Sequence, residues 1–176
     1  MVVYKYSFYF LILVTVGLWL AVFTLPDSNL HLISCDVGQG DATLIVYGNI
    51  QVLVDGGPTN KVLDCLSRYI PFWDREIEMV ILTHPDSDHY MGLIEVVKRY
   101  KVDHYLDNGL ISSNQSYQVL RKGVGGDGIK VYTAKKGTRI RMGKIYLDIV
   151  SPQETNSQKD SNENSLVIDL RYGSFE

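Results

Sequence analysis

Cysteine and proline are scarce in this sequence of 176 residues, which contains two cysteines and five prolines. Two cysteines are too few to form a disulfide framework in a domain of this length, and their separation is not the spacing of a metal site. Basic residues do not dominate either. The net charge of -3 argues against a protein that binds nucleic acid chiefly by neutralising phosphates across its whole surface.

Internal repeats are also missing, because no segment recurs at the period expected of a solenoid. Apolar residues make up 45% of the chain and charged residues 21%, which is the composition of a folded protein rather than of a disordered chain. The length suits one compact domain with an appendage and excludes a multidomain enzyme.

The appendage is an apolar run of 20 residues without charge, residues 6–25, between Lys5 and Pro26. As a helix this run reaches about 30 Å, the thickness of the hydrocarbon core of a bilayer. A cleaved signal peptide has a shorter apolar stretch followed by small residues, and residues 22–24 offer no such cleavage site. We therefore predict that residues 1–26 form an uncleaved signal anchor, rather than a signal peptide or a buried core helix.

The orientation of this anchor is indicated by Lys5, the one basic residue before the apolar run. A positive flank tends to remain in the cytoplasm, so residues 27–176 are predicted to be extracytoplasmic. Such a compartment permits disulfides. Cys35 falls in a predicted apolar strand and Cys65 on the apolar face of a predicted helix, which favours two buried thiols and leaves a disulfide between them open.

The rest of the chain, residues 29–176, is predicted to be one domain in which helices follow strands. Three strands open it as a β-meander, since short runs rich in Ile, Leu and Val flank a turn at Gly48-Asn49. A helix and then a fully apolar strand come next, which indicates an α/β fold. The predicted strands are 29–37, 42–47, 50–54, 79–82, 102–106, 130–134, 139–142, 145–150 and 165–172, the predicted helices are 59–70, 92–100 and 115–122, and a polar loop covers 151–164.

The strongest chemical signal is the segment of residues 83–89, which follows a buried strand and precedes a helix. Four potential metal ligands lie within it. In a tight loop this spacing can direct His84 and Asp86 at one cation, and Asp88 and His89 at an adjacent one. The alternative is a polar loop in which Asp88 caps the next helix and both histidines are solvated.

At these residues the sequence resembles the metallo-beta-lactamase fold, whose hallmark is a His-x-His-x-Asp-His loop after a buried strand. The version here is His-x-Asp-x-Asp-His. This substitution is similar to the ComEC-type branch of that fold, as are residues 36–42 (Asp-Val-Gly-Gln-Gly-Asp-Ala), 53–57 (Leu-Val-Asp-Gly-Gly) and 162–167 (Asn-Glu-Asn-Ser-Leu-Val). The resemblance covers residues 31–172 and implies the N-terminal portion of an αββα sandwich, preceded by one transmembrane helix.

The resemblance also implies a function. Members of this branch are membrane-associated competence proteins for DNA uptake or shorter standalone relatives that resemble hydrolases, and a chain with one span resembles the latter. It implies two divalent ions, Zn or Mn, and hydrolysis of nucleic-acid phosphodiesters at the membrane. Protein partners are not indicated.

Site residues follow from the same resemblance. It implies that His84, Asp86, Asp88 and His89 bind metal, that Asp88 is also catalytic, that Asp55, Asp36 and Asp41 lie behind the ligands and orient them, and that Asn162 and Ser165 bind substrate. Two alternatives stay open. Asp36 and Asp41 can belong to a glycine turn whose acids cap nearby amides, and Asn162 and Ser165 can be turn and cap residues.

The same family closes its site with a bridging Asp and a late His from the second half of the domain, both beyond the Asn-x-x-Ser segment. We therefore expect a truncated member with an incomplete ligand set and poor catalysis. His31 and His104 are better explained as ordinary strand histidines. The alternative function is a degenerate domain that binds metal or a protein partner without hydrolysis.

One run of basic residues bears on the substrate. Six of them fall within fifteen residues that contain no Asp or Glu, and they can follow a phosphate backbone. The alternative is the solvated face of an antiparallel hairpin. The six are Lys130, Lys135, Lys136, Arg139, Arg141 and Lys144.

Overall fold

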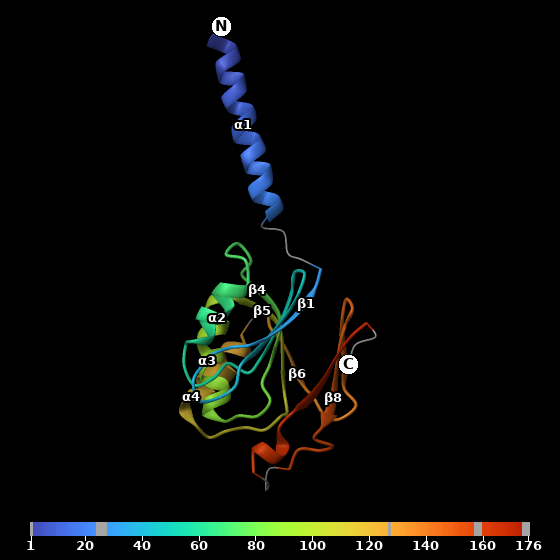
Figure 1. Ribbon diagram of the computed structural model, residues 1–176. Helices are drawn as coiled ribbons and strands as arrows, with labels where there is room; N and C mark the ends of the chain where they lie inside the picture. Colours follow the sequence, from blue (N-terminus) through green and yellow to red (C-terminus); the bar gives the residue numbers. More distant parts are fainter. Residues whose placement is uncertain (1, 24–27, 127, 157–159, 174–176) are drawn as a thin grey trace.

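The computed structural model describes residues 2–23, 28–126, 128–156 and 160–173 (Figure 1). A long helix stands apart from a domain with two sheets. In chain order the elements are α1 (Val2–Phe23), β1 (Leu30–Ser34), β2 (Thr43–Tyr47), β3 (Ile50–Val54), α2 (Val62–Tyr69), β4 (Glu76–Ile81), α3 (Ser87–Arg99), β5 (Lys101–Asp107), α4 (Gln115–Val124), β6 (Lys130–Thr133), β7 (Arg139–Met142), β8 (Ile145–Ser151), the 3-10 turn η1 (Asn162–Asn164) and β9 (Val167–Tyr172).

The larger sheet has the strand order β1-β2-β3-β4-β5-β6. Its first three strands are antiparallel neighbours, which confirms the predicted β-meander. From β3 to β6 the strands are parallel, and α2, α3 and α4 make the crossovers on one face of the sheet (Figure 1). The carboxyl ends of the parallel strands therefore lie at one end of the sheet, and their amino ends at the other.

Successive side chains along each strand point to opposite faces of the larger sheet, so the core has two parts. On β3, Leu53 packs with the helices, whereas its neighbour Val52 packs against the second sheet. The second sheet has the order β7-β8-β9, and its inward residues Ile145 and Leu147 are fully buried. The layers of the described residues are thus helices, a six-stranded sheet and a three-stranded sheet, because each sheet face must cover its apolar side chains.

Helix α1 carries the span expected of the anchor. Tyr4–Val22 is long and apolar enough to cross a membrane, with a mean hydropathy of 1.7, and none of it is buried. That exposure contradicts the alternative of a buried core helix. Residue 1 and residues 24–26 of the predicted anchor lie outside the described part of the chain.

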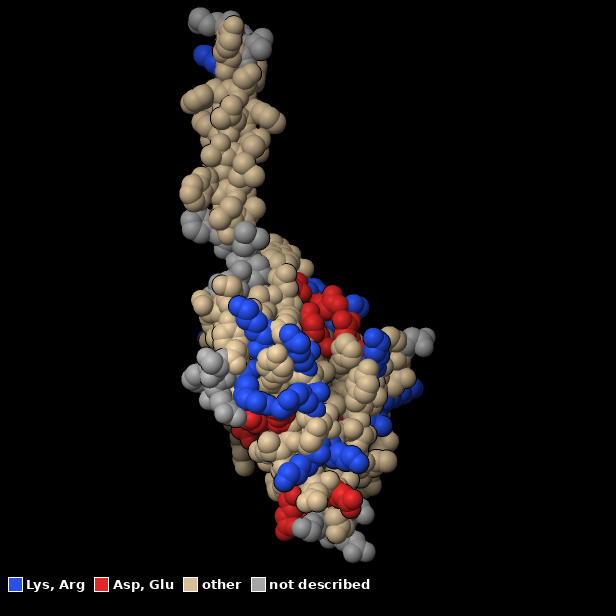
Figure 2. All heavy atoms as spheres, turned by 90° about the vertical axis from the view of Figure 1, so that its right-hand side faces the viewer, with Lys and Arg blue, Asp and Glu red and all other residues tan. Residues whose placement is uncertain are grey.

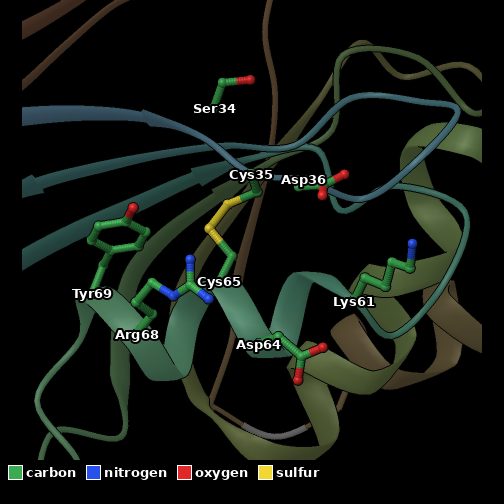
Figure 3. Close-up of a pocket in the computed structure, with 8 residues that line it drawn as sticks. All are labelled: Ser34, Cys35, Asp36, Lys61, Asp64, Cys65, Arg68 and Tyr69. Carbon is green, nitrogen blue, oxygen red and sulfur yellow. A yellow bond between two sulfur atoms is a disulfide. The ribbon is translucent and has the colours of Figure 1, made fainter.

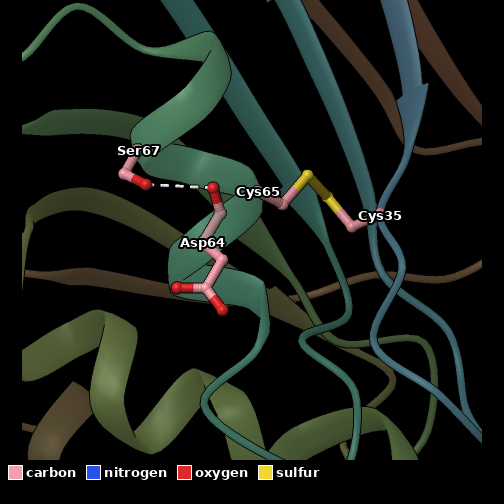
Figure 4. The surroundings of a disulfide bond; sticks show 4 residues. All are labelled: Cys35, Asp64, Cys65 and Ser67. Carbon is pink, nitrogen blue, oxygen red and sulfur yellow. Dashed lines mark hydrogen bonds between the residues drawn. A yellow bond between two sulfur atoms is a disulfide. The ribbon is translucent and has the colours of Figure 1, made fainter.

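The preference for two buried thiols was wrong. Cys35 lies just beyond the end of β1 rather than within a strand, and it forms a disulfide with Cys65 of α2 (Figure 4). Beside it, Ser67 Oγ donates a hydrogen bond to the carbonyl oxygen of Asp64 at 2.9 Å. The disulfide joins α2, in the helical layer, to the segment that follows β1.

Replacing both Cys35 and Cys65 by serine is expected to lower the free energy of unfolding by about 3 kcal/mol, because the 30-residue loop is no longer closed in the unfolded chain. The measurement is urea unfolding of the chain in detergent, with and without a reductant. Serine at both positions should make the two conditions identical, and an unchanged midpoint on reduction of the native chain would contradict the prediction.

Two elements begin earlier than predicted. Helix α3 begins at Ser87 rather than at 92, and β4 begins at Glu76 rather than at 79. The missed residues mix polar side chains with isolated apolar ones such as Ile77 and Met91, so they do not form a continuous apolar run. Asp88 and His89 consequently belong to the first helical turn, and the residue before that helix is Asp86, not Asp88.

Candidate metal centre

The segments that carry the predicted ligands meet at the carboxyl ends of β3 and β4. Val54 pairs with Ile81 across these parallel strands, so the residues that follow, Asp55 and Thr83, arrive side by side. Asp55 has a φ of 58°, a left-handed conformation that Asp adopts more readily than most residues. This turns the chain sharply at the strand end and aims the carboxylate under the start of α3.

Asp55 is the centre of a buried hydrogen-bond network. Only 3% of its surface is exposed. Its Oδ1 accepts from Thr83 N at 2.8 Å and its Oδ2 from Thr83 Oγ1 at 2.7 Å, while His89 Nδ1 lies 2.8 Å from Oδ2. With Nδ1 donating to this carboxylate, the lone pair of His89 is left on Nε2, where a metal ion would take it.

His84 lies directly against His89. The two rings are 4.0 Å apart between centroids. His84 Nδ1 is 3.0 Å from Thr83 Oγ1 and 3.4 Å from Ser165 Oγ, whereas its Nε2 is buried without a hydrogen-bond partner among the described residues. A buried polar nitrogen without a partner costs free energy, and a bound cation would satisfy it.

Three carboxylates surround the imidazole nitrogens at longer range. Asp86 Oδ2 is 3.6 Å from His84 Nε2, and Asp88 Oδ2 is 3.9 Å from His89 Nε2. These are the two His–Asp pairs that the sequence suggested, and they are adjacent. Asp41 Oδ2 is 4.0 Å from His89 Nε2.

No three His, Cys, Asp or Glu side chains converge on one point in the part of the chain that is described. The donor set nevertheless fits divalent cations, because carboxylate oxygens lie within 4.0 Å of the Nε2 atom of each imidazole. The side chains of Asp86, Asp88 and Asp41 are 37%, 48% and 80% exposed, so packing leaves them room to rotate toward a bound ion, and Asp86 would give up the hydrogen bond from Ser161 Oγ in doing so.

The two histidines have opposite pKa shifts. Burial, and then the neighbouring His89, lowers the pKa of His84. Burial also lowers the pKa of His89, but the hydrogen bond to Asp55 and the charges of Asp55, Asp88 and Asp41 outweigh it and raise that pKa overall. Of the two imidazoles, His84 is therefore the weaker base and His89 the stronger.

The remaining predicted site residues lie at the margin. Asp36 is exposed and faces a polar cavity of about 330 Å³ beside α2, shared with Lys61 and Arg68 (Figure 3). No hydrogen bond or ion pair links it to either histidine among the described residues. Asn162 is exposed and its side chain donates to Asp160 Oδ1 at 3.0 Å, so of the pair Asn162 and Ser165 only the serine touches the centre.

Sequence reasoning missed residues that hold this centre together. Asn164 is 1% exposed, and its amide donates to the carbonyl oxygens of Asn156 and Asp160 while its carbonyl oxygen accepts from Asn156 N at 2.7 Å. Buried Asn108 donates to Asn164 O at 2.9 Å. Ser161, held in the same loop, donates to Asp86 Oδ1 at 2.6 Å. Asn164 therefore orders the polar loop. The sequence predicts a role for Asn162, two residues earlier, and not for Asn164.

The basic run is spread over β6 and the β7–β8 hairpin, on a face where Lys and Arg gather (Figure 2). Arg139 is engaged, because its Nε and Nη2 donate to Asp148 at 2.5 and 2.9 Å. Arg141 lies over the Tyr146 ring at 5.4 Å. The alternative of a solvated hairpin face is therefore realised in part, and Lys130, Lys135 and Lys136 remain exposed beside it.

Comparison with solved structures decides the fold. The metallo-beta-lactamase fold protein YhfI from Bacillus subtilis superposes with a TM-score of 0.56 at 16% identity, over 82% of this chain and 58% of that one. MEM-A1, a subclass B3 metallo-beta-lactamase from a soil metagenome library, gives 0.53 at 17% identity, over 85% and 56%. The chain has the metallo-beta-lactamase fold. The predicted fold class is thereby confirmed.

Sequence comparison agrees with the metallo-beta-lactamase fold. Residues 35–112 match the model of the metallo-beta-lactamase superfamily. ComE operon protein 3 of Bacillus subtilis (strain 168), a ComEC-type protein, is 25% identical over 184 aligned positions, which cover 90% of this chain and 23% of that protein. The chain thus spans about a quarter of the length of this relative. The predicted resemblance to the ComEC-type branch is confirmed.

Proposed function

We propose that this protein is a membrane-anchored, metal-dependent hydrolase of phosphodiesters. One observation carries the proposal: His84 and His89 lie ring against ring beside three carboxylates, and the buried Nε2 of His84 has no hydrogen-bond partner among the described residues. The similarity to ComE operon protein 3 favours a nucleic-acid substrate, as in DNA uptake. A diphosphatase from the PhnP family shares the fold, with a TM-score of 0.51 at 15% identity over 82% of this chain and 62% of that one, and also acts on a phosphate linkage.

Each residue of the candidate centre has a separate role in the proposed reaction. His84 with Asp86, and His89 with Asp88, would each hold one divalent ion. The chemistry that such ions would supply, when bound, is a lower pKa for a bound water and partial neutralisation of the negative charge of a phosphodiester. Asp88 is half exposed beside His89, so its carboxylate can accept the proton of an attacking water while the hydrogen bond to Asp55 fixes the His89 ring.

The decisive experiment is a phosphodiesterase assay on the full chain in detergent with Mn²⁺ or Zn²⁺. Asp88→Ala is expected to abolish turnover, and Asp64→Ala is the matched control, because Asp64 is an exposed Asp in α2, a helix that carries none of the predicted ligands. Turnover that survives Asp88→Ala would contradict the assignment of Asp88.

A second candidate function is metal or partner binding without hydrolysis. It is favoured by the absence of any convergent group of three ligands in the described residues. In that case the assay detects no turnover with either metal, while Mn²⁺ still raises the thermal unfolding midpoint of the native chain and not that of His84→Ala.

The metal preference is expected to be less biased toward zinc than that of the all-histidine loop. Asp86 supplies a hard oxygen where the family hallmark has an imidazole, and carboxylate oxygen suits Mn²⁺ better than imidazole does. Metal analysis after incubation with equal Zn²⁺ and Mn²⁺ should find manganese retained. Asp86→His is the matched variant and should shift retention to zinc; exclusive zinc in the native chain would contradict the expectation.

We also propose that α1 anchors the chain and that the domain is extracytoplasmic. The exposed apolar helix and the single positive flank favour this arrangement, and the Cys35–Cys65 disulfide is typical of an oxidising compartment. A protease added to intact cells should therefore digest the domain. Complete protection, or a soluble mature chain that starts near Asp27, would contradict the proposal.

A further inference from the structure

An exposed aromatic turn lies between α2 and β4. Phe72 and Trp73 are 80% and 47% exposed. They occupy the tip of a tight turn, which closes where Asp74 N donates to the carbonyl oxygen of Pro71 at 2.9 Å. Large rings at adjacent turn positions form an exposed apolar feature of the kind that marks an interaction site.

The turn is held in place by the side chain of Asp74. Its Oδ1 accepts from Glu76 N at 3.1 Å, and its Oδ2 accepts from the buried amide of Gln51 at 3.1 Å. The acidic group of the turn therefore points inward to β3 and β4, and the outer surface of the turn is left to the two rings. Tyr69, in the last turn of α2, is 46% exposed and adds a third ring nearby in sequence.

Strand register places this turn at the end of the sheet where the chain enters the domain. Leu30 at the start of β1 pairs with Tyr47, which pairs with Ile50 at the start of β3. The start of the parallel strand β4 lies at that same end, since Val52 pairs with Met79. β1 and β4 are three strand spacings apart, or about 14 Å. Figure 1 shows the turn at the end of the domain from which α1 departs.

The link to α1 is short. Four residues, 24–27, separate Phe23 from Ser28, and covalent geometry limits their reach to about 18 Å. If α1 spans a bilayer, the entry end of the sheet cannot move far from the membrane surface. The aromatic turn shares that end, whereas the histidines lie at the opposite, carboxyl end of the strands.

We infer that Phe72 and Trp73 insert into the interface of the same bilayer that α1 spans, so that the domain is docked on the lipid surface at two points. Aromatic rings favour the headgroup level, where an apolar body and a polar edge are both satisfied. Docking at this end turns the metal centre away from the lipid. The inference rests on the proposed anchoring by α1.

The experiment uses the two tryptophans of the chain, Trp19 in α1 and Trp73 in the turn. The full chain is reconstituted into phosphatidylcholine vesicles whose acyl chains carry bromine either near the headgroup or near the chain end. Trp19→Phe leaves Trp73 as the reporter, and Trp73→Phe leaves Trp19. A third variant combines both replacements with Ile111→Trp, because Ile111 is 75% exposed in the loop after β5, at the opposite end of the sheet.

Trp73 is expected to lose roughly half of its emission to bromine near the headgroup and less to bromine at the chain end, as befits an interfacial ring. Tryptophan at position 111 should not be quenched. If Trp19 is quenched and Trp73 is not, the docking inference fails and the anchor stands. If Trp19 is not quenched, both fail. Protection of Trp73 from acrylamide without quenching by bromine would mean that protein covers the turn, and would also overturn the inference.

Discussion

Replacing Gly92 by alanine is expected to lower the free energy of unfolding by about 4 kcal/mol, since overpacking against rigid backbone cannot relax. Gly92 lies within α3, and a Cβ there would stand 2.0 Å from Gly56 O and 2.5 Å from Thr59 O. The close approach is also used for a hydrogen bond, in which Gly92 N donates to Gly57 O at 2.9 Å. The measurement is urea unfolding followed by the near-ultraviolet circular dichroism of the buried tyrosines.

Gly123→Ala is the matched control for this substitution. Gly123 also lies in a helix, but its Cβ would meet only the side-chain atom Val97 Cγ2, at 3.2 Å. There the lost entropy of the unfolded chain offsets a small steric cost, and the unfolding free energy should remain within about 0.5 kcal/mol of the native value. Equal losses for the two variants would show that close packing of α3 on the Gly56–Gly57 turn is not what holds it.

Asp55→Ala is expected to cost about 4 kcal/mol of stability, because three buried or partly buried donors lose one buried charged acceptor. The donors are Thr83 N, Thr83 Oγ1 and His89 Nδ1. Each joins the end of β3 to the segment that carries the predicted ligands, so the same change should loosen the metal centre. Unfolding in urea gives the stability, and calorimetric titration with Mn²⁺ gives the affinity.

Asp55→Asn separates the two effects. Asparagine tolerates the left-handed backbone at this position and can still accept from Thr83 N, so about 2 kcal/mol should be lost. An amide facing His89 Nδ1 favours the tautomer with its proton on Nε2, and metal affinity should fall roughly 10- to 100-fold. Native affinity in this variant would contradict the role of Asp55 as the group that orients His89.

The order of helices and strands could be predicted because each buried strand is a short apolar run and each helix has an apolar stripe. The start of α3 could not. Ser87 and Asp88 give no apolar signal, and the turn is helical because tertiary contacts of His89 and Tyr90, both buried, hold it in place. The sequence indicated which residues form the candidate centre, but not that two of them, Asp88 and His89, lie in the first turn of α3.

Contacts between residues far apart in the sequence could not be predicted either. Whether Cys35 meets Cys65 depends on α2 packing across the start of the sheet, which neither local pattern contains. The choice between Asn162 and Asn164 likewise depends on which one faces the core, and only Asn164 is enclosed by Asn108 and Asn156. The family motif pointed to Asn162, whereas the packing of the loop buries Asn164.

The Cys35–Cys65 disulfide also determines how a proteolytically cleaved chain behaves in electrophoresis. A single cut in the exposed stretch around Thr59 and Asn60 would leave α1 covalently linked to everything after Cys65. On a gel without reductant such a nicked protein migrates as an intact one. Reduction of the disulfide separates it into two fragments on the gel, one with α1 and one without it.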